Sequence, residues 1–399
     1  MKNKINSFIK EKSTQLFEKV KGYREFIHAH PELSYQEVET MNFVSKILTN
    51  LGIEHQTKIG DTGVVAIIKG ERHKGITECV ALRSDLDALP ILEENDVSYK
   101  STIDGLMHAC GHDVHTSILL GVAEILSEIK EELPYPVKLI FQPGEEKNPG
   151  GATLMIRDGV LENPKVKEMY ALHVFPDMEV GKVGFRSGLY MASCDEVYIT
   201  FIGKGGHGAM PHQAIDPILM GAQFITSVQQ IVSRNCDPTV PCVLTFGHFE
   251  GLGATNVIPS KVFLKGTFRT MNEVWRKEAL MLIKEHADAI ASAVGGVAEV
   301  EISNGYPYLE NNPELTDSLK NRAISFLGSE NVEELALRMT SEDFAFYSHE
   351  VPVCFFRLGV RNGAKGITHG VHHPKFDIDP EALKIGMQVM CLSVLGEDL

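Results

Sequence analysis

The chain has 399 residues, of which 43% are hydrophobic and 8% aromatic, so a small disulfide-stapled scaffold and a disordered chain are both excluded. Lys and Arg total 38 against 53 Asp and Glu, and the net charge of −15 opposes binding to nucleic acid or to an anionic membrane surface. We therefore expect a globular protein of two domains that acts on a small molecule.

The amino terminus and the cysteines indicate a cytoplasmic protein. Residues 1–12 interrupt their few apolar side chains with lysines, unlike the apolar core of a signal peptide, and no run is long enough to span a bilayer. The seven cysteines are odd in number and scattered, unlike a disulfide framework. All except Cys110 are interpreted as small buried hydrophobic residues.

The first ~185 residues alternate apolar strands with amphipathic helices, which predicts a mostly parallel α/β sheet flanked by helices. The predicted elements are strands at 64–69, 79–84, 137–142 and 169–174 and a helix at 116–133. The same pattern resumes near Asn311 with a helix at 315–326, a strand at 353–358 and a last helix from Pro380.

A different pattern separates these two stretches. Its predicted elements follow the order βαββαβ, at 196–202, 217–233, 242–249, 262–268, 272–294 and 298–303. That order is typical of a ferredoxin-like α+β domain. We predict a catalytic domain formed by 1–189 and 306–399, interrupted by an inserted domain at 190–305.

The densest chemical signal is the segment 107–115, Met-His-Ala-Cys-Gly-His-Asp-Val-His, just before a predicted helix. Cys110 and His112 are two residues apart on a turn, so a thiolate and an imidazole can bind one cation. Simple packing of a Cys-Gly-His turn would explain this segment equally well if it stood alone.

Further ligand-type side chains follow predicted strands. Glu145 and Glu146 come directly after the strand 137–142, at the end where ligands collect in open α/β sheets. One carboxylate can bind metal while the other reaches a water. His173 lies at the end of another strand, and His372 and His373 precede the last helix.

Two aspartates come directly after the predicted strand 79–84. Asp85 and Asp87 lie on the same side, since strand side chains alternate. They are interpreted either as support for a ligand or as turn-initiating residues before Pro90.

At these residues the sequence resembles the dimetal aminoacylase and carboxypeptidase superfamily, specifically its branch of hippurate hydrolases, N-acyl-amino-acid amidohydrolases and auxin-conjugate hydrolases. The resemblance spans nearly the whole chain. Its landmarks are the segments 30–34 (HPELS), 83–90, 108–113 (HACGHD), 142–146 (QPGEE), 172–173, 205–207 with 211–212, 256–259, 341–344 and 372–376 (HHPKF).

The resemblance implies specific roles. Cys110 would bridge two divalent cations (zinc, manganese, cobalt or nickel), and the remaining ligands would be His112, Glu146, His173 and His372. His372 is preferred to His373 because the family has a histidine, one residue and then proline at this site. Asp85 stands where distant relatives use a metal histidine, so it and Asp87 are expected to support the ligands.

The resemblance also implies the reaction, hydrolysis of N-acyl-L-amino acids by a metal-activated water with Glu145 as general base. His207 of the inserted domain would stabilise the oxyanion, in cis or from a partner subunit. Asn256 and Arg269 would bind the substrate carboxylate, although Arg269 could equally be a surface ion-pair partner. A homodimer or higher oligomer through the inserted domain is expected.

Four other functions were weighed. Cleavage of dipeptides or carboxypeptidase action is the nearest, because the same chemistry serves any small amide. A cysteine hydrolase using Cys110 leaves Glu146, His173 and His372 without a role. A noncatalytic binding protein would leave Glu145 without a role. The glycine pattern at 203–208 resembles a dinucleotide site, but no helix opens on its last glycine.

Overall fold

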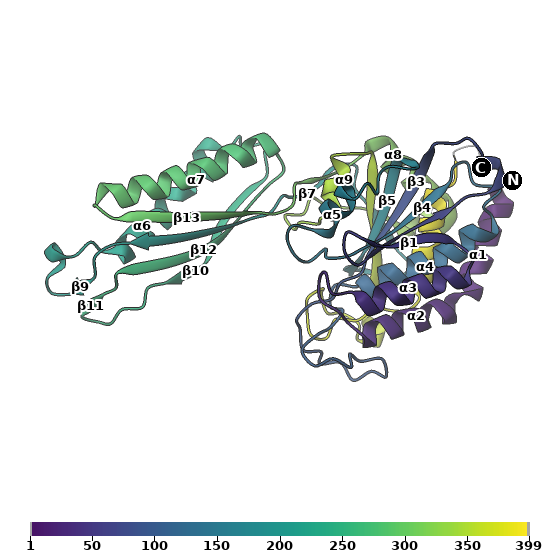
Figure 1. Ribbon diagram of the computed structural model, residues 1–399, viewed down its shortest axis with the longest axis horizontal. Coiled ribbons are helices and arrows are strands. Elements are labelled where there is room, and N and C mark those ends of the chain that lie inside the picture. The colour runs from purple at the N-terminus through teal and green to yellow at the C-terminus, as the bar shows by residue number, and fades with distance from the viewer. Residues whose placement is uncertain (1, 397–399) are drawn as a thin grey trace. The chain divides into compact units, whose positions relative to one another are not determined.

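A computed structural model describes residues 2–396, and the side chains of 4–396. The chain divides into two compact units (Figure 1). Unit 1 is formed by the described residues of Met1–Gly188, Glu310–Ala336 and Phe346–Leu399, and unit 2 by Leu189–Leu309 and Leu337–Ala345. Each unit encloses a hydrophobic core of its own.

Unit 1 is built on a mixed sheet that has eight strands among the described residues. In spatial order the strands are β1 (Glu54–Ile59), β2 (Gly63–Ile68), β4 (Val137–Gln142), β3 (Glu78–Asp85), β5 (Lys165–Glu179), β16 (Val353–Arg361), β6 (Val183–Phe185) and β15 (Val332–Glu334). The four central strands β4, β3, β5 and β16 run parallel. β1, β2 and β6 join through antiparallel pairs, so the parallel part forms the centre.

Helices of unit 1 pack with this sheet in one core. The helices are α1 (Lys2–Gln15), α2 (Phe17–Ala29), α3 (Val38–Asn50), α4 (His112–Glu128), α5 (Gly151–Arg157), α8 (Pro313–Leu327) and α10 (Ala382–Ser393). α4 lies centrally, with α2 and α3 beside it in Figure 1. Its apolar side chains are almost all buried, which explains why this helix is hydrophobic around most of its circumference.

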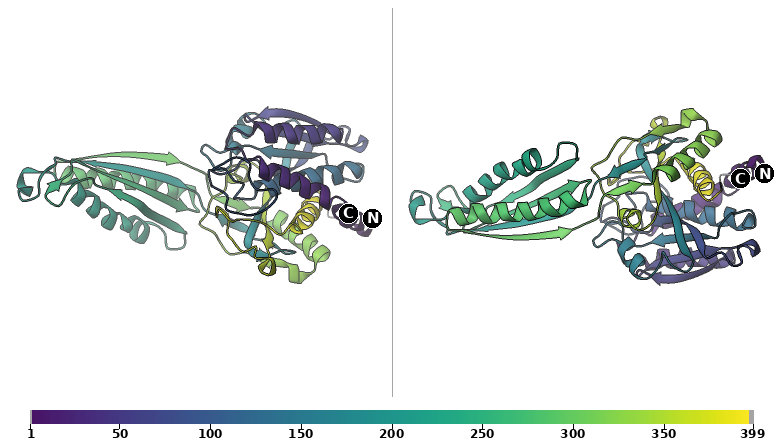
Figure 2. Two further views of the ribbon diagram at one scale, coloured as in Figure 1. Left: turned by 90° about the horizontal axis from the view of Figure 1, so that it is seen from below. Right: turned by 90° about the horizontal axis from the view of Figure 1, so that it is seen from above.

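Unit 2 is an antiparallel four-stranded sheet in the order β10 (Cys242–Glu250), β12 (Lys261–Thr270), β8 (Asp195–Ile202) and β13 (Val297–Asn304). α6 (Pro217–Gln230) and α7 (Glu273–Ala293) share one core with the sheet, and Figure 2 shows both helices on the same face. The chain order βαββαβ with this strand order is the ferredoxin-like arrangement. A small sheet pairs β9 (Gly206–His207) with β11 (Val257–Ile258).

Short elements occur where the chain passes from one unit to the other. They are β7 (Gly188–Met191), β14 (Leu309–Asn311) and α9 (Ala345–Ser348). No helix in the described part of the chain is long and apolar enough to cross a membrane.

The predicted fold class is confirmed: unit 1 is an α/β sheet flanked by helices, and unit 2 is α+β. Several elements differ from the predicted bounds, and one of these differences moves a candidate ligand into a helix. The helix predicted at 116–133 spans His112–Glu128, so His112 is its first residue. Gly111 makes the early start possible, because its φ of +94° is left-handed and a Cβ there would lie 2.5 Å from a methyl of Val174.

Candidate metal centre

The predicted ligands arise at the carboxyl-terminal side of the parallel strands of unit 1. Cys110 and His112 lie at the start of α4, and Glu145 and Glu146 lie in the loop that follows β4. His173 belongs to β5, and His372 lies between β16 and α10. Parallel strands bring these separate segments to one edge of the sheet, where ligands collect in open α/β folds.

The potential ligand atoms lie close together. Five groups of possible ligands among the described residues have all their ligand atoms within 4.8 Å of one another, and three consist only of predicted ligands and Glu145: Cys110–His112–His173, Cys110–Glu146–His372 and His112–Glu145–Glu146. The first two share Cys110. Its Sγ is 3.4 Å from Nε2 of His173, and Nε2 of His372 is 3.1 Å from a carboxylate oxygen of Glu146. The structure therefore brings all five predicted ligands and Glu145 together.

Asp87 orients both His112 and the glutamates. Nδ1 of His112 donates to the main-chain oxygen of Asp87 at 2.8 Å and approaches its carboxylate at 3.1 Å. The same carboxylate accepts the main-chain N–H groups of Glu145 and Glu146, at 3.0 and 2.9 Å. Because Nδ1 of His112 donates to Asp87, a cation that replaces the Nε2 proton would meet the Nε2 lone pair, as in carboxylate–histidine–metal arrangements.

Asp85 is fully buried beside His112, with a carboxylate oxygen 3.7 Å from Nε2 of His112, and both of its oxygens accept hydrogen bonds from the protein. One oxygen accepts from Nδ1 of His115 at 2.6 Å and the other from Arg83 at 2.7 Å. Nε2 of His115 accepts the main-chain N–H of Val174 at 3.0 Å. Both nitrogens of His115 are therefore in use, so this histidine supports Asp85 and β5 and leaves no lone pair for a cation.

The two late histidines differ in their surroundings. The main-chain N–H of His372 donates to the oxygen of Ala109 at 2.7 Å, which joins this loop to the segment that carries Cys110. His372 has a φ of +63°, a left-handed conformation that costs a non-glycine residue about 1 kcal/mol or more. His373 instead accepts the N–H of Lys375 and stacks on His369 at 4.2 Å. Of the two, His372 is the one that reaches Glu146.

The buried carboxylates of the centre favour positive charge on the groups around them. Burial acts to lower the pKa of His112, but Asp85 and Asp87 outweigh it and raise this pKa to about 10. Burial, reinforced by Glu146 and Glu145, raises the pKa of the Cys110 thiol. Burial and the nearby Arg357 lower the pKa of His173.

These directions of the pKa shifts disfavour the function of a cysteine hydrolase. A cysteine nucleophile needs a lowered thiol pKa and an imidazole that can accept its proton. The pKa of the Cys110 thiol is raised, and that of its neighbour His173 is lowered. A divalent cation would supply the missing positive charge and favour the thiolate.

The side chains fit divalent cations. Nε2 of His112 is buried without a hydrogen-bond partner, and a carboxylate oxygen of Glu146 contacts Nε2 of His372. A buried polar atom such as Nε2 of His112 is seldom left without a partner, and here it lies in one group with the thiol of Cys110 and the imidazole of His173. Sulfur, nitrogen and oxygen donors together suit zinc, manganese, cobalt or nickel.

The three remaining predicted residues lie in unit 2. His207 and Asn256 come together at the small sheet, where His207 pairs with Val257 and the N–H of Gly208 donates to the oxygen of Asn256 at 2.8 Å. Both are exposed. Arg269 lies on β12 and donates to the oxygen of Met339 at 3.1 Å. Their roles stay predictions.

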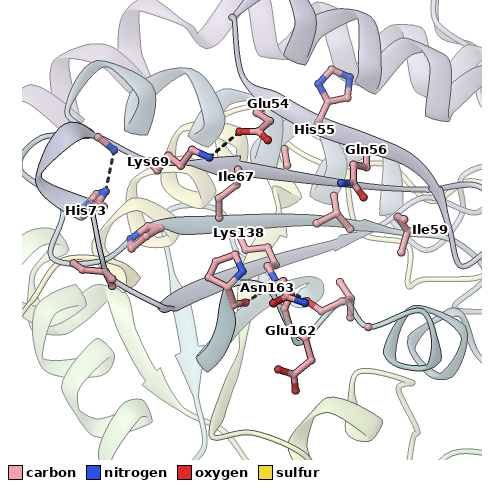
Figure 3. A pocket seen from close by; sticks show the side chains of 18 of the residues that line it. Glu54, His55, Gln56, Ile59, Ile67, Lys69, His73, Lys138, Glu162 and Asn163 are labelled. Carbon is pink, nitrogen blue, oxygen red and sulfur yellow. Dashed lines mark hydrogen bonds and ion pairs between the residues drawn. The ribbon is translucent and has the colours of Figure 1, made fainter.

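A separate pocket of unit 1 lies over β1, β2 and β4, with a volume of about 960 Å³ (Figure 3). Its lining mixes both charges: Lys69 pairs with Glu54, and the ammonium of Lys138 donates to three main-chain oxygens. None of the predicted site residues lines it. The pocket is therefore not the site of the predicted chemistry.

The sequence interpretation missed several residues that support the centre. His115 lies within a segment that was singled out, but its partner Asp85 is 30 positions away. Ser34 donates to Asp87 at 2.7 Å from the HPELS segment, to which no role was assigned. The one sequence signal that could have pointed to Ser34 is that its segment, 30–34, is a landmark of the family resemblance.

An α/β sheet whose carboxyl-terminal edge gathers a thiol, three imidazoles and two carboxylates defines a metal-dependent hydrolase. The chain belongs to peptidase family M20/M25/M40, whose model matches residues 81–395. The superfamily resemblance and the enzyme class predicted from the sequence are thereby confirmed.

Relatives of known name agree with this family. The chain is 39% identical to an IAA-amino acid hydrolase of Arabidopsis thaliana, over 95% of this chain and 86% of the relative. It is 40% identical to an N-acyl-L-amino acid amidohydrolase of Geobacillus stearothermophilus, over 74% and 80%. A solved dinuclear metal-binding M20 peptidase of Bacillus subtilis superposes with a TM-score of 0.79 at 31% identity, covering 96% of this chain and 98% of that one.

Proposed function

We propose that the chain hydrolyses the amide bond of N-acyl-L-amino acids to a carboxylic acid and a free amino acid, using two divalent cations. The observation that carries the proposal is the convergence of five ligand-type side chains beside Glu145, from four separate segments of unit 1. Two relatives named for hydrolysing amino-acid conjugates support the substrate class.

Cys110 is proposed to bridge the cations, because two of the ligand groups share its sulfur. His112 and His173 accompany Cys110 in one group, and Glu146 and His372 accompany it in the other. The name of the dinuclear M20 structure supports two cations rather than one. Zinc, manganese, cobalt and nickel all match this mixed set of donors.

The proposed reaction needs only water as nucleophile. Cations held by these ligands would lower the pKa of that water and polarise the amide carbonyl. Glu145 takes a proton as the water oxygen bonds to the acyl carbon, and it returns the proton to the amide nitrogen as the C–N bond breaks. Glu145 is 7% exposed and lies 4.0 Å from Nε2 of His112, so it is shielded from solvent beside the ligands.

Residues of unit 2 are proposed to complete the substrate site. His207 would donate to the developing oxyanion, and Asn256 and Arg269 would bind the substrate carboxylate. We further propose a homodimer formed through unit 2. Localisation in the cytoplasm is supported by the seven cysteines, all of which are free thiols.

Cleavage of small peptides, as a dipeptidase or carboxypeptidase, is the second candidate, favoured by the word peptidase in the name of the solved M20 structure. Both candidates are tested by loading the protein with zinc, manganese, cobalt or nickel and assaying N-acetyl- and N-benzoyl-amino acids beside dipeptides. We expect kcat/KM to be highest for an N-acyl-L-amino acid and to vanish with a chelator. A higher value for dipeptides would replace the proposal with its alternative. No turnover of any substrate would support a noncatalytic binding protein.

A further inference from the structure

Two segments far apart in the sequence meet beside the metal centre. We call residues 143–150, between β4 and α5, the glutamate loop, because they include Glu145 and Glu146. We call residues 34–37, just before α3, the clamp segment. Three side chains of the clamp segment, those of Ser34, Tyr35 and Glu37, reach the glutamate loop or Asp87.

Tyr35 binds the part of the glutamate loop that follows Glu146. Its hydroxyl donates to the main-chain oxygen of Lys147 at 2.6 Å and accepts the N–H of Gly150 at 3.1 Å. Its ring occupies the space beside Gly144, where a Cβ would lie 2.2 Å from a ring carbon. Gly144 has a φ of +58°, so the loop turns sharply against the ring just before Glu145.

Glu37 is fully buried and binds the part of the same loop that precedes Glu145. One carboxylate oxygen accepts the N–H of Gly144 at 2.8 Å, and the other accepts the hydroxyl of Thr62 at 2.5 Å. Burial and the nearby Asp87 raise its pKa to about 7. A carboxyl group is costly to bury, so its retention here needs a reason beyond packing.

We propose that Tyr35 and Glu37 are positioning residues that fix the glutamate loop, so that Glu145 faces the attacking water and Glu146 faces a cation. This inference rests on the proposed function for its catalytic consequence. Hydrogen bonds at Gly144 and at Lys147 and Gly150 flank the two glutamates on both sides. Asp87, held by Ser34, fixes the N–H groups between them.

The test uses Tyr35→Phe and Glu37→Met, which roughly keep the size of each side chain and remove the oxygens that bind the loop. Glu32→Gln is the control at a nearby glutamate, since Glu32 accepts N–H groups of Glu39 and Thr40 at the start of α3 and none from the glutamate loop. Tyr135→Phe is the control for the tyrosine, because its ring lies under Lys167 elsewhere in unit 1. Amide hydrogen exchange of peptides covering 143–150 is measured on metal-free protein, and kcat and KM on metal-loaded protein.

We expect each clamp variant to exchange about tenfold faster in the glutamate loop and to lose roughly tenfold in kcat with KM within about twofold, as the loss of a buried hydrogen bond predicts. The controls should change neither. Unchanged exchange, unchanged kcat, or the same loss in Glu32→Gln would overturn the inference. If the wild-type protein turned over no acyl-amino acid, the proposed function would fail, while the exchange data would still decide whether the clamp holds the loop.

Discussion

Replacing Glu145 by alanine is expected to lower kcat by about 10²- to 10⁴-fold, the usual contribution of a general base, while the cations stay bound. Glu145 contributes a carboxylate beside His112 and Glu146, but the chain offers five other ligand-type side chains for the cations. The main chain of residue 145 would still donate to Asp87, so the loop should keep its course. Turnover and metal content are measured on the same preparation.

The neighbouring variant Glu146→Ala provides the contrast. Glu146 lies 3.1 Å from His372 and in the same group as Cys110, so its loss should reduce metal content as well as turnover. A Glu145→Ala protein with near-normal kcat would refute the assignment of Glu145 as base. A Glu145→Ala protein that loses its cations would instead make Glu145 a ligand.

Replacing Cys110 by alanine is expected to weaken cation binding by more than about 100-fold, the upper end of what loss of a supporting hydrogen bond costs. Its sulfur is the atom that the two ligand groups share, so neither cation position would be complete without it. Turnover should fall with metal content. Isothermal titration with zinc or manganese measures the affinity, and elemental analysis measures the number of cations per chain.

Cys79→Ala is the matched control for this prediction. Cys79 is also buried and free, but its thiol contacts the oxygen of Pro164 and no ligand-type group of the metal centre. Its loss should leave metal content unchanged. If Cys110→Ala lost turnover while binding cations as tightly as the wild type, and a chelator left the wild type active, the cysteine hydrolase would be the better account.

Much of the fold could be predicted from the sequence pattern, because the buried strands are short runs of mostly apolar residues. β4 was predicted with its observed bounds, since Val137–Gln142 is a short apolar run that ends at Pro143. The start of α4 was placed four residues late. His112, Asp113 and His115 break the apolar pattern, and their burial depends on partners such as Arg24 and Asp85, which lie outside the helix.

The candidate ligands could be predicted because the family resemblance points to them, and because several lie next to a predicted strand end or helix start, positions that parallel strands bring to one edge. The supporting contacts could not. Asp87 serves His112, Glu145 and Glu146 through hydrogen bonds that join residues 25 to 59 positions apart. Glu37 contacts Gly144 across 107 positions, and no local pattern records such a contact.

The most direct test of the account is anomalous diffraction from crystals of the zinc- or manganese-loaded protein. It predicts two anomalous peaks per chain, both within bonding distance of Cys110 Sγ, about 2.3 Å for zinc, with His112, Glu146, His173 and His372 completing the coordination. Peaks elsewhere in the chain, or full occupancy without contact to Cys110, would contradict it.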